Sequence, residues 1–232
     1  MQKNCVFNWS GGKDSTLALH HALQDPSLII RNLLTTVNDG FDRVSMHGVR
    51  SSLLIEQAES IGIDLIQVRL PEMPGMDVYE NAMDKQMNAL YRAGITHSIY
   101  GDIFLEDLKT YRETKLAEIG MQALFPLWKR DTKELLKEFL ALGYKTVVVC
   151  AQDGLADFCG RVIDDNFIND LPEGIDPCGE NGEFHTFVFD GQIFKQPIAY
   201  TLGEKVFKTY ETAEIKGAGY WYIDLLPDAK IT

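Results

Sequence analysis

Short apolar runs alternate with helical repeats through the first 125 residues, and this alternation is the strongest constraint on the fold. Apolar runs typical of buried strands lie at residues 5–9, 28–37, 64–70 and 97–101. Helical patterns follow them at residues 15–23, 54–61, 79–94 and 106–118. Because parallel strands need crossover connections, which are usually helices, we predict an α/β fold: a doubly wound parallel sheet with helices on both faces.

The pattern changes after residue 125. Asp131 and Glu134 form a predicted capping box for a helix that ends at Gly143. A predicted strand at residues 146–150 precedes a long loop rich in Asp, Gly and Pro. Further strand-like runs lie at residues 184–189 and 192–194, joined by a predicted hairpin turn at Asp190-Gly191, and at residues 205–212 and 219–225. We therefore predict two domains, residues 1–125 and a smaller, mostly antiparallel α+β domain at residues 126–232.

Composition excludes several classes of protein. The 232 residues carry a formal net charge of −12, and they lack the basic runs that nucleic-acid binding requires, so we expect no nucleic-acid partner. No segment approaches the roughly 20 apolar residues that span a membrane, and the N-terminus lacks the apolar stretch of a signal peptide. We expect a cytoplasmic protein without a membrane partner. The four cysteines form no C-x-x-C pair, and buried free thiols are the favoured interpretation.

The first predicted strand is followed by a segment that we call the phosphate loop, Ser10-Gly11-Gly12-Lys13-Asp14-Ser15. It is not a Walker A motif, because Asp14 follows the lysine and Phe7 stands where that motif has a glycine. Its two glycines permit a sharp turn that brings backbone N–H groups to an anion at a helix N-terminus. Lys13 adds positive charge, the two serines can donate hydrogen bonds, and Asp14 can orient the loop or bind Mg²⁺. A plain N-capped glycine turn is the alternative.

The phosphate loop resembles the PP-loop of the N-type ATP pyrophosphatases, a Rossmann-like superfamily that cleaves ATP between the α- and β-phosphates. This resemblance implies that the loop binds the pyrophosphate end of ATP and that the chemistry is adenylyl transfer. Further segments are similar to the diphthine–ammonia ligase family, including its stand-alone ATP-binding-domain relatives: Ser45-Met46-His47-Gly48-Val49-Arg50, Tyr100-Gly101-Asp102-Ile103, Pro126-Leu127-Trp128 and Cys178-Gly179-Glu180-Asn181-Gly182-Glu183-Phe184-His185-Thr186. The resemblance covers residues 6–194, and that family usually has a glycine where Asn181 stands.

Three acidic residues are predicted to act in catalysis. Glu180 and Glu183 lie in a glycine-flanked segment that enters a predicted strand, so both can face the carboxyl edge of a sheet. A carboxylate there can position ammonia, accept its proton or bind Mg²⁺, whereas the alternative is a solvated acidic loop. Asp102 follows a strand end beside Gly101, where open α/β sheets bind ligands, and a structural role for it is equally favoured. Gly101 is assigned to nucleotide binding.

Other polar and aromatic residues are weaker candidates. His47 precedes a helix and is predicted to contact the nucleotide, with a surface histidine as the alternative. Arg112 could pair with a substrate or AMP phosphate, but an exposed helix arginine is commoner. For Trp128 and His185 the favoured interpretations are packing and a structural role in a strand.

These features predict an ATP-dependent, AMP-forming amidoligase that uses Mg²⁺. It would adenylate a substrate carboxylate, release pyrophosphate and amidate the acyl group with ammonia. By resemblance, the acceptor is diphthine on elongation factor 2, which becomes diphthamide, and a small-molecule acid is the other candidate. The alternatives are a tRNA-modifying PP-loop enzyme, which would need a basic RNA face, and an ATP-binding sensor without turnover. Whether the protein forms a homo-oligomer is left open.

Overall fold

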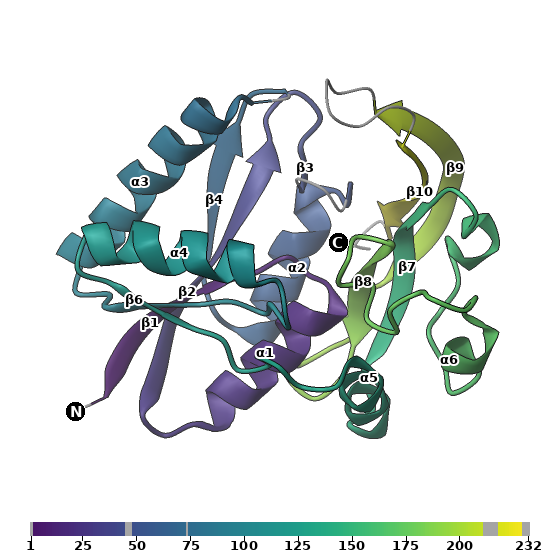
Figure 1. Ribbon diagram of the computed structural model, residues 1–232, viewed down its shortest axis with the longest axis horizontal. Helices are drawn as coiled ribbons and strands as arrows, with labels where there is room; N and C mark the ends of the chain where they lie inside the picture. Colours follow the sequence, from purple (N-terminus) through teal and green to yellow (C-terminus); the bar gives the residue numbers. More distant parts are fainter. Residues whose placement is uncertain (1, 45–47, 73, 211–217, 229–232) are drawn as a thin grey trace.

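The computed structural model describes residues 2–44, 48–72, 74–210 and 218–228 (Figure 1). The first half of the described chain forms one sheet, here called sheet A. Its strands are β1 (Lys3–Asn8), β2 (Leu28–Asn38), β3 (Arg43–Val44), β4 (Leu65–Leu70), β5 (His97–Ile99) and β6 (Gln122–Leu124). Leu33 and Leu34 of β2 pair with both β1 and β4, so these two strands flank β2. The parallel strands therefore run in the order β4-β2-β1-β5-β6, and β3 pairs antiparallel with the end of β2.

Helices cover both faces of sheet A, as predicted. They are α1 (Lys13–Gln24), α2 (Ser51–Ile61), α3 (Met76–Arg92) and α4 (Glu106–Glu118). Leu17 and Leu54, from α1 and α2, belong to a core cluster that also contains Phe7 of β1. Met87 and Leu116, from α3 and α4, belong to a second cluster on the other face. Because helices bury both faces of the sheet, its strands are apolar on both sides. This arrangement confirms the doubly wound α/β fold.

The strand order reverses between β1 and β5. From β1 the chain moves to β2 and β4 on one side, and it then returns to β5 and β6 on the other. The loops that leave β1 and β5 at their carboxyl ends thus diverge to opposite faces and leave a crevice between them. In open α/β sheets this position is where ligands bind.

The second half of the described chain forms an antiparallel sheet, sheet B, with the order β8-β7-β10-β9. Asp131 caps α5 by accepting a hydrogen bond from the Glu134 N–H at 2.9 Å, as the predicted capping box requires. The elements are α5 (Thr132–Ala141), β7 (Lys145–Gln152), the 3₁₀ helix η1 (Ala156–Phe158), α6 (Phe167–Asp170), β8 (Phe184–Asp190), β9 (Tyr200–Tyr210) and β10 (Ala218–Pro227). The mostly antiparallel C-terminal half is confirmed.

Two predictions about strands were wrong. The run at residues 192–194 is not a strand, and β8 pairs with β7 instead of forming a hairpin across Asp190-Gly191. Gly191 lies against the ring of Tyr144 and Phe194 is buried in the core, so packing fixes this segment in a turn. The short strand β6 was not predicted, because its three residues are too few to show a period.

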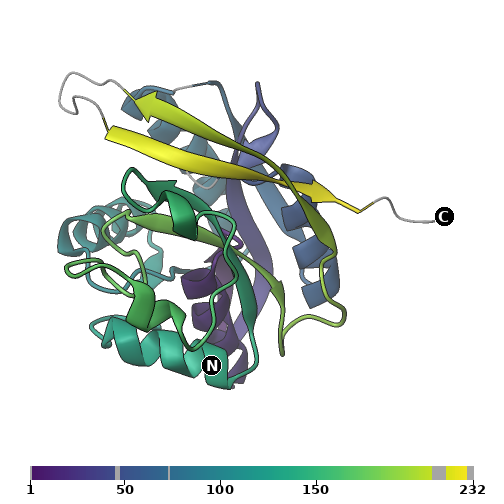
Figure 2. The same ribbon diagram turned by 90° about the vertical axis from the view of Figure 1, so that its right-hand side faces the viewer.

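The contacts between sheet B and the first half of the chain include a shared core and a cluster of charges around Asp224. The larger core cluster contains residues from both sheets, including Phe7 and Phe187. Asp224 on β10 accepts from Arg43 at 2.8 Å and from Arg50 at 2.6 Å. Although burial raises the pKa of Asp224, these two guanidinium groups outweigh that effect and lower it to about 2. Figure 2 shows β9 and β10 as a long ribbon that extends beside β3 and α2.

Candidate active site

The phosphate loop lies at the N-terminus of α1, directly after β1. Gly11 has a φ of +78°, which favours glycine, and a Cβ there would lie 2.7 Å from Oε1 of Gln57. Its carbonyl accepts hydrogen bonds from the Val188 N–H at 2.9 Å and from Nε2 of Gln57 at 3.1 Å. The loop is therefore held by α2 and by sheet B as well as by its own helix.

The polar groups of the phosphate loop are bonded to one another. The Ser10 hydroxyl donates to the Ser15 hydroxyl at 3.0 Å, and the Ser15 hydroxyl donates to the Gly12 carbonyl at 2.9 Å. The N–H of Lys13 donates to Oγ1 of Thr186 at 3.0 Å. This contact from β8 was not predicted, since nothing local in the sequence pairs a helix N-terminus with a strand so far along the chain.

The ammonium group of Lys13 is buried and charged. It donates to the Asp14 carboxylate at 2.8 Å and to the carbonyl of Cys178, and it lies 5.2 Å from the centre of the Phe184 ring. Burial lowers the pKa of Lys13, but the neighbouring Asp14 and Cys178 outweigh that effect and raise it. The site therefore keeps a fixed positive charge next to the N-terminus of α1.

The loop before β8 covers the phosphate loop and is folded by its own side chains. Oδ2 of Asp176 accepts from the N–H groups of Cys178 and Glu180, both at 3.0 Å. Oε1 of Glu183 accepts from the Asp176 N–H at 3.1 Å and from the Asn181 side chain at 3.0 Å. Glu183 is buried and is not among the described residues that line the cavity. Its carboxylate thus holds the loop that carries Glu180, a role that Asn181 shares.

Glu180 faces the cavity. Its Oε1 accepts a hydrogen bond from the Ile103 N–H at 2.7 Å, which links the loop before β8 to the loop after β5. Burial raises the pKa of Glu180 to about 7; the Ile103 N–H lowers it, while the nearby carboxylates of Asp14 and Asp102 raise it further. A carboxyl group that titrates near neutrality can accept or donate a proton at physiological pH.

The loop after β5 meets the phosphate loop at Gly101. A Cβ on Gly101 would lie 3.0 Å from the Ser15 backbone nitrogen, so a larger residue here would crowd the backbone of the phosphate loop. Oδ2 of the next residue, Asp102, lies 2.9 Å from Nη1 of Arg112, whose guanidinium carbon is 4.1 Å from the centre of the Tyr100 ring. Burial raises the pKa of Asp102 above its ordinary value, and the neighbouring Arg112 offsets only part of that effect. Arg112 is therefore a half-buried residue that lines the cavity, and not an exposed helix arginine.

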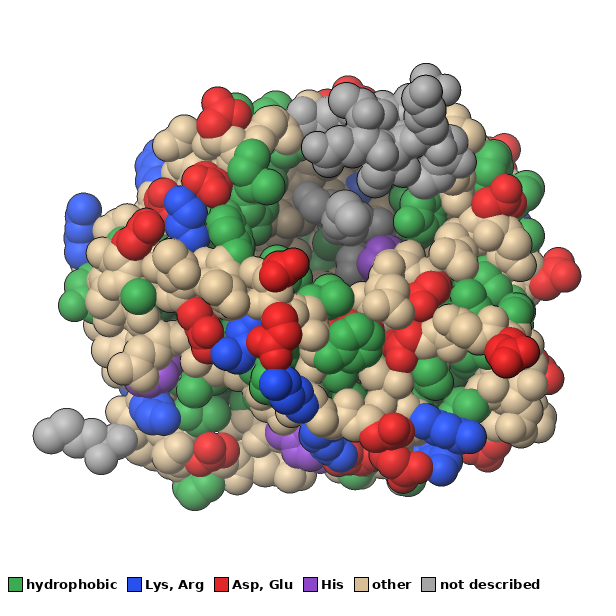
Figure 3. Space-filling model, viewed as in Figure 1, with side chains coloured by type: hydrophobic (Ala, Val, Ile, Leu, Met, Phe, Trp, Pro, Cys, Tyr) green, Lys and Arg blue, Asp and Glu red, His purple; other side chains and the backbone are tan. Residues whose placement is uncertain are grey.

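These groups surround one cavity of about 500 Å³, and Figure 3 shows the molecule hollowed between the α3–α4 side and the β9–β10 side. Most of the predicted site residues line it: Ser10, Gly12, Lys13, Asp14, Ser15, Gly101, Asp102 and Glu180, together with His185. Trp128 does not; its ring packs 5.7 Å from Phe125. His47 lies outside the described residues.

Two family models match the chain. The model of the diphthamide synthase N-terminal domain matches residues 3–123, and the model of the diphthamide synthase C-terminal domain matches residues 131–219. The chain belongs to the diphthamide synthase family. The diphthamide synthase matches include the phosphate loop, Asp102, Arg112 and the loop that carries Glu180. The family indicated by the sequence motifs is confirmed.

Curated relatives in this family carry one name. A diphthine–ammonia ligase from Schizosaccharomyces pombe is 24% identical over 222 residues, which cover 85% of this chain and 36% of that protein. The protein of that name from Danio rerio is 32% identical over 110 residues, or 44% of this chain and 43% of that protein. For the Rattus norvegicus protein the identity is 24% over 220 residues, or 85% of this chain and 82% of that protein. The chain thus matches less than half the length of two of these relatives.

A solved structure is also similar to part of the chain. A U34-tRNA thiolase from Methanococcus maripaludis covers 60% of this chain at 18% identity with a TM-score of 0.37, which is too low to bear on function. Within the described ranges of the chain, no helix has the length and apolarity to cross a bilayer.

Proposed function

We propose that the chain is an ATP-dependent, AMP-forming amidoligase. The observation that carries the proposal is that the phosphate loop and the Glu180 carboxyl group line the same cavity. An anion-binding loop alone would suit any nucleotide-binding protein, including a sensor. A half-buried carboxyl group with a pKa of about 7 beside that loop adds a group able to take a proton during a reaction.

In the first step, a carboxylate oxygen of the acceptor attacks the α-phosphorus of ATP, and pyrophosphate leaves. The leaving group gains negative charge as the bond breaks, and a fixed cation stabilises that charge. Lys13 supplies the cation, and pyrophosphate oxygens would replace the Cys178 carbonyl that the ammonium group contacts in this structure. The hydroxyls of Ser10 and Ser15 can turn from each other toward phosphate oxygens.

In the second step, ammonia attacks the acyl carbon of the adenylate, the C–N bond forms, and AMP leaves with the electron pair of the C–O bond. The nitrogen must lose one proton to become an amide. Glu180 accepts that proton on its carboxylate, because its raised pKa makes it a stronger base than an exposed glutamate. Asp102, which also lines the cavity, contributes negative charge beside it.

The acceptor in this proposal is the diphthine carboxylate of elongation factor 2, and the product is diphthamide. The name shared by the curated relatives, diphthine–ammonia ligase, supports this choice. A small-molecule carboxylic acid is the other candidate acceptor.

The proposal includes Mg²⁺, and the oxygen donors of the described site are suited to binding it. Among the described residues there is no group of three or more His, Cys, Asp and Glu side chains that could hold a metal by themselves. Mg²⁺ in nucleotide sites is usually bound by one or two carboxylates together with substrate phosphates. Asp14 lines the cavity next to Lys13 and would be that carboxylate. The ion would neutralise phosphate charge.

The proposal is tested by supplying the purified chain with ATP, Mg²⁺, ammonium and a panel of acceptors that includes elongation factor 2 carrying diphthine. We expect AMP and pyrophosphate in amounts equal to the amide formed, with repeated turnover only when both acceptor and ammonium are present. Lys13→Ala should weaken the binding of ATP more than that of AMP in calorimetry, since Lys13 is assigned to the pyrophosphate end. Lys133→Ala, at an exposed position of α5, is the matched control.

Release of ADP and phosphate in place of AMP would refute the proposed chemistry. Tight ATP binding with no AMP formed for any acceptor of the panel would favour the sensor.

A further inference from the structure

The cavity has an arm that extends away from the phosphate loop, between α3 and α4. These two helices lie side by side over one face of sheet A (Figure 1). The arm is lined from α3 by Glu80, Met83, Asp84 and Met87, and from α4 by Arg112, Lys115 and Leu116. The roles proposed for the phosphate loop and for Glu180 assign no ligand to this arm of the cavity.

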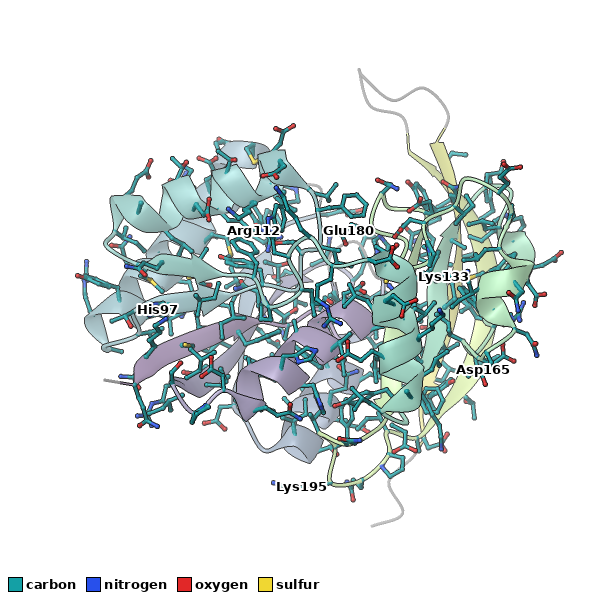
Figure 4. The ribbon with its side chains drawn as sticks, turned by 60° about the horizontal axis from the view of Figure 1, so that its bottom comes forward. His97, Arg112, Lys133, Asp165, Glu180 and Lys195 are labelled. Atoms are coloured by element: carbon teal, nitrogen blue, oxygen red, sulfur yellow. The ribbon has the colours of Figure 1, made fainter. Side chains whose placement is uncertain are left out.

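Arg112 links the arm to the reaction centre. Its Nη1 lies 2.9 Å from Oδ2 of Asp102, and its guanidinium stacks on the Tyr100 ring at 4.1 Å. Oδ2 of Asp102 is buried and makes no hydrogen bond of normal geometry within the described residues. The pair is thus held by charge and stacking, which fix the guanidinium plane and leave N–H groups able to bind a second anion. In Figure 4, Arg112 and Glu180 both lie near the middle of the molecule.

The arm also carries the charges of Glu80, Asp84 and Lys115, of which Glu80 and Lys115 form an ion pair. The ammonium group of Lys115 lies 2.8 Å from the Glu80 carboxylate, and the Tyr111 hydroxyl donates to the same carboxylate at 3.2 Å. The arm also has apolar walls, with Met83, Met87 and Leu116 among its lining residues. The arm therefore suits an aliphatic stem with a carboxylate at its inner end.

We propose that Arg112 binds the acceptor carboxylate and that the arm between α3 and α4 holds the aliphatic stem behind it. This inference rests on the proposed function and names the part of the site that selects the acceptor. Asp102, the partner of Arg112, is followed in the chain by Ile103, whose N–H donates to Glu180 at 2.7 Å, so a carboxylate at Arg112 lies close to the group assigned to the second step. A guanidinium can bind a carboxylate through two parallel N–H groups, which orients its oxygens for attack.

The kinetic test uses the full chain, elongation factor 2 carrying diphthine, and saturating Mg²⁺-ATP. Arg112→Gln should raise the KM for the acceptor about tenfold or more, the scale expected when a charge-assisted hydrogen bond is lost, without changing the Kd for ATP. Arg112→Lys keeps the charge beside Asp102 and hence the fold, and it should raise the KM less. Lys109→Gln is the control, because Lys109 is on the same helix but faces Phe125 and Trp128.

A change in the Kd for ATP with an unchanged KM for the acceptor would assign Arg112 to the nucleotide and overturn the inference. Unchanged values for both would also overturn it. If the wild-type chain forms no amide, the proposed function fails, and the second measurement tests Arg112 by itself.

The second measurement follows the modification of arginines by phenylglyoxal, mapped by mass spectrometry of peptides. Hexanoate, which has a carboxylate on an aliphatic stem, should slow the modification of Arg112, whereas hexanol should not. Arg92, exposed at the end of α3, is the internal reference and should react at one rate in both solutions. Equal protection of Arg112 and Arg92 by hexanoate, or no protection of either, would refute a carboxylate site at Arg112.

Discussion

Glu180 and Glu183 stand three residues apart, yet their carboxylates have different surroundings. Glu180 lines the cavity and contacts the loop after β5, whereas Glu183 accepts hydrogen bonds inside its own loop. The structure thus favours a direct role for Glu180 and a positioning role for Glu183. Both roles remain predictions that a pair of variants can separate.

Glu180→Gln should slow amide formation by about 10²–10⁴-fold, the usual contribution of a positioned acid or base, while ATP binding persists. The wild-type rate should also rise with pH through about 7, because the Glu180 carboxyl group must lose its proton before it can accept one. The glutamine variant should lack this rise. The measurement is the initial rate against pH, with the concentration of free ammonia held constant.

Glu183→Gln is the control for that profile. The amide oxygen of glutamine can still accept from Asp176 and Asn181, so we expect a smaller loss of rate and a rise that stays near pH 7. A pH-dependent rise that survives in Glu180→Gln would assign the base to another group.

The site residues that could be predicted from the sequence are those that share one short segment. Ser10 to Ser15 lie on one turn after a strand, so their pattern alone indicates an anion site. By contrast, the contact of Lys13 with Thr186 and that of Gly11 with Gln57 depend on how sheet B and α2 pack against the loop. The sequence favours Arg112 as a surface residue, because nothing in the local pattern of α4 indicates that its side chain stacks on Tyr100.

At the scale of elements, the helices and the longer strands follow from periodicity. Leu54 and Ala58 mark the buried face of α2, and Gly62, with a φ of +85°, ends that helix as predicted. The errors concern short segments and strand partners. β6 has three residues, and β8 pairs with a strand that precedes it by more than thirty residues. Strand pairing over such separations is decided by packing, which periodicity does not report.

At the same scale, the contact of Asp224 on β10 with Arg43 and Arg50 can be tested by measuring the free energy of unfolding. Asp224→Asn should lower the free energy of unfolding near pH 7 by about 1–2 kcal/mol, because it removes a partly exposed carboxylate shared by Arg43 and Arg50. The pKa of Asp224 falls from 3.8 to about 2 on folding, so its contribution is complete above pH 3.8 and is lost as the pH falls through about 2. The difference between wild type and variant in urea denaturation should shrink over that range.

Asp165→Asn, at an exposed position near α6, is the reference for the loss of one negative charge. Equal effects of the two substitutions at neutral pH would mean that the link from β10 to β3 and α2 contributes nothing measurable.

At the scale of the whole molecule, charge determines the class of partner. The net charge of −12 opposes the approach of a polyanion, and the cavity carries acidic groups beside Lys13 and Arg112. We expect no complex with tRNA in a gel-shift assay at about 0.1 M salt, where the Debye length is roughly 10 Å. A complex that weakens as salt is raised would contradict this prediction and favour the tRNA-modifying alternative.

The hydrogen bond from Lys13 to Thr186 joins groups 173 residues apart, and the carbonyl of Gly11 is bonded to Val188 in the same strand. During synthesis on the ribosome, the phosphate loop therefore emerges long before the strand that supports it. A nascent chain of the first half has β1 and α1 but lacks the Thr186 hydroxyl, the Cys178 carbonyl and Glu180. The loop reaches its final form only after β8 has left the exit tunnel, so the nucleotide binding that we propose for this site is expected to begin late in translation.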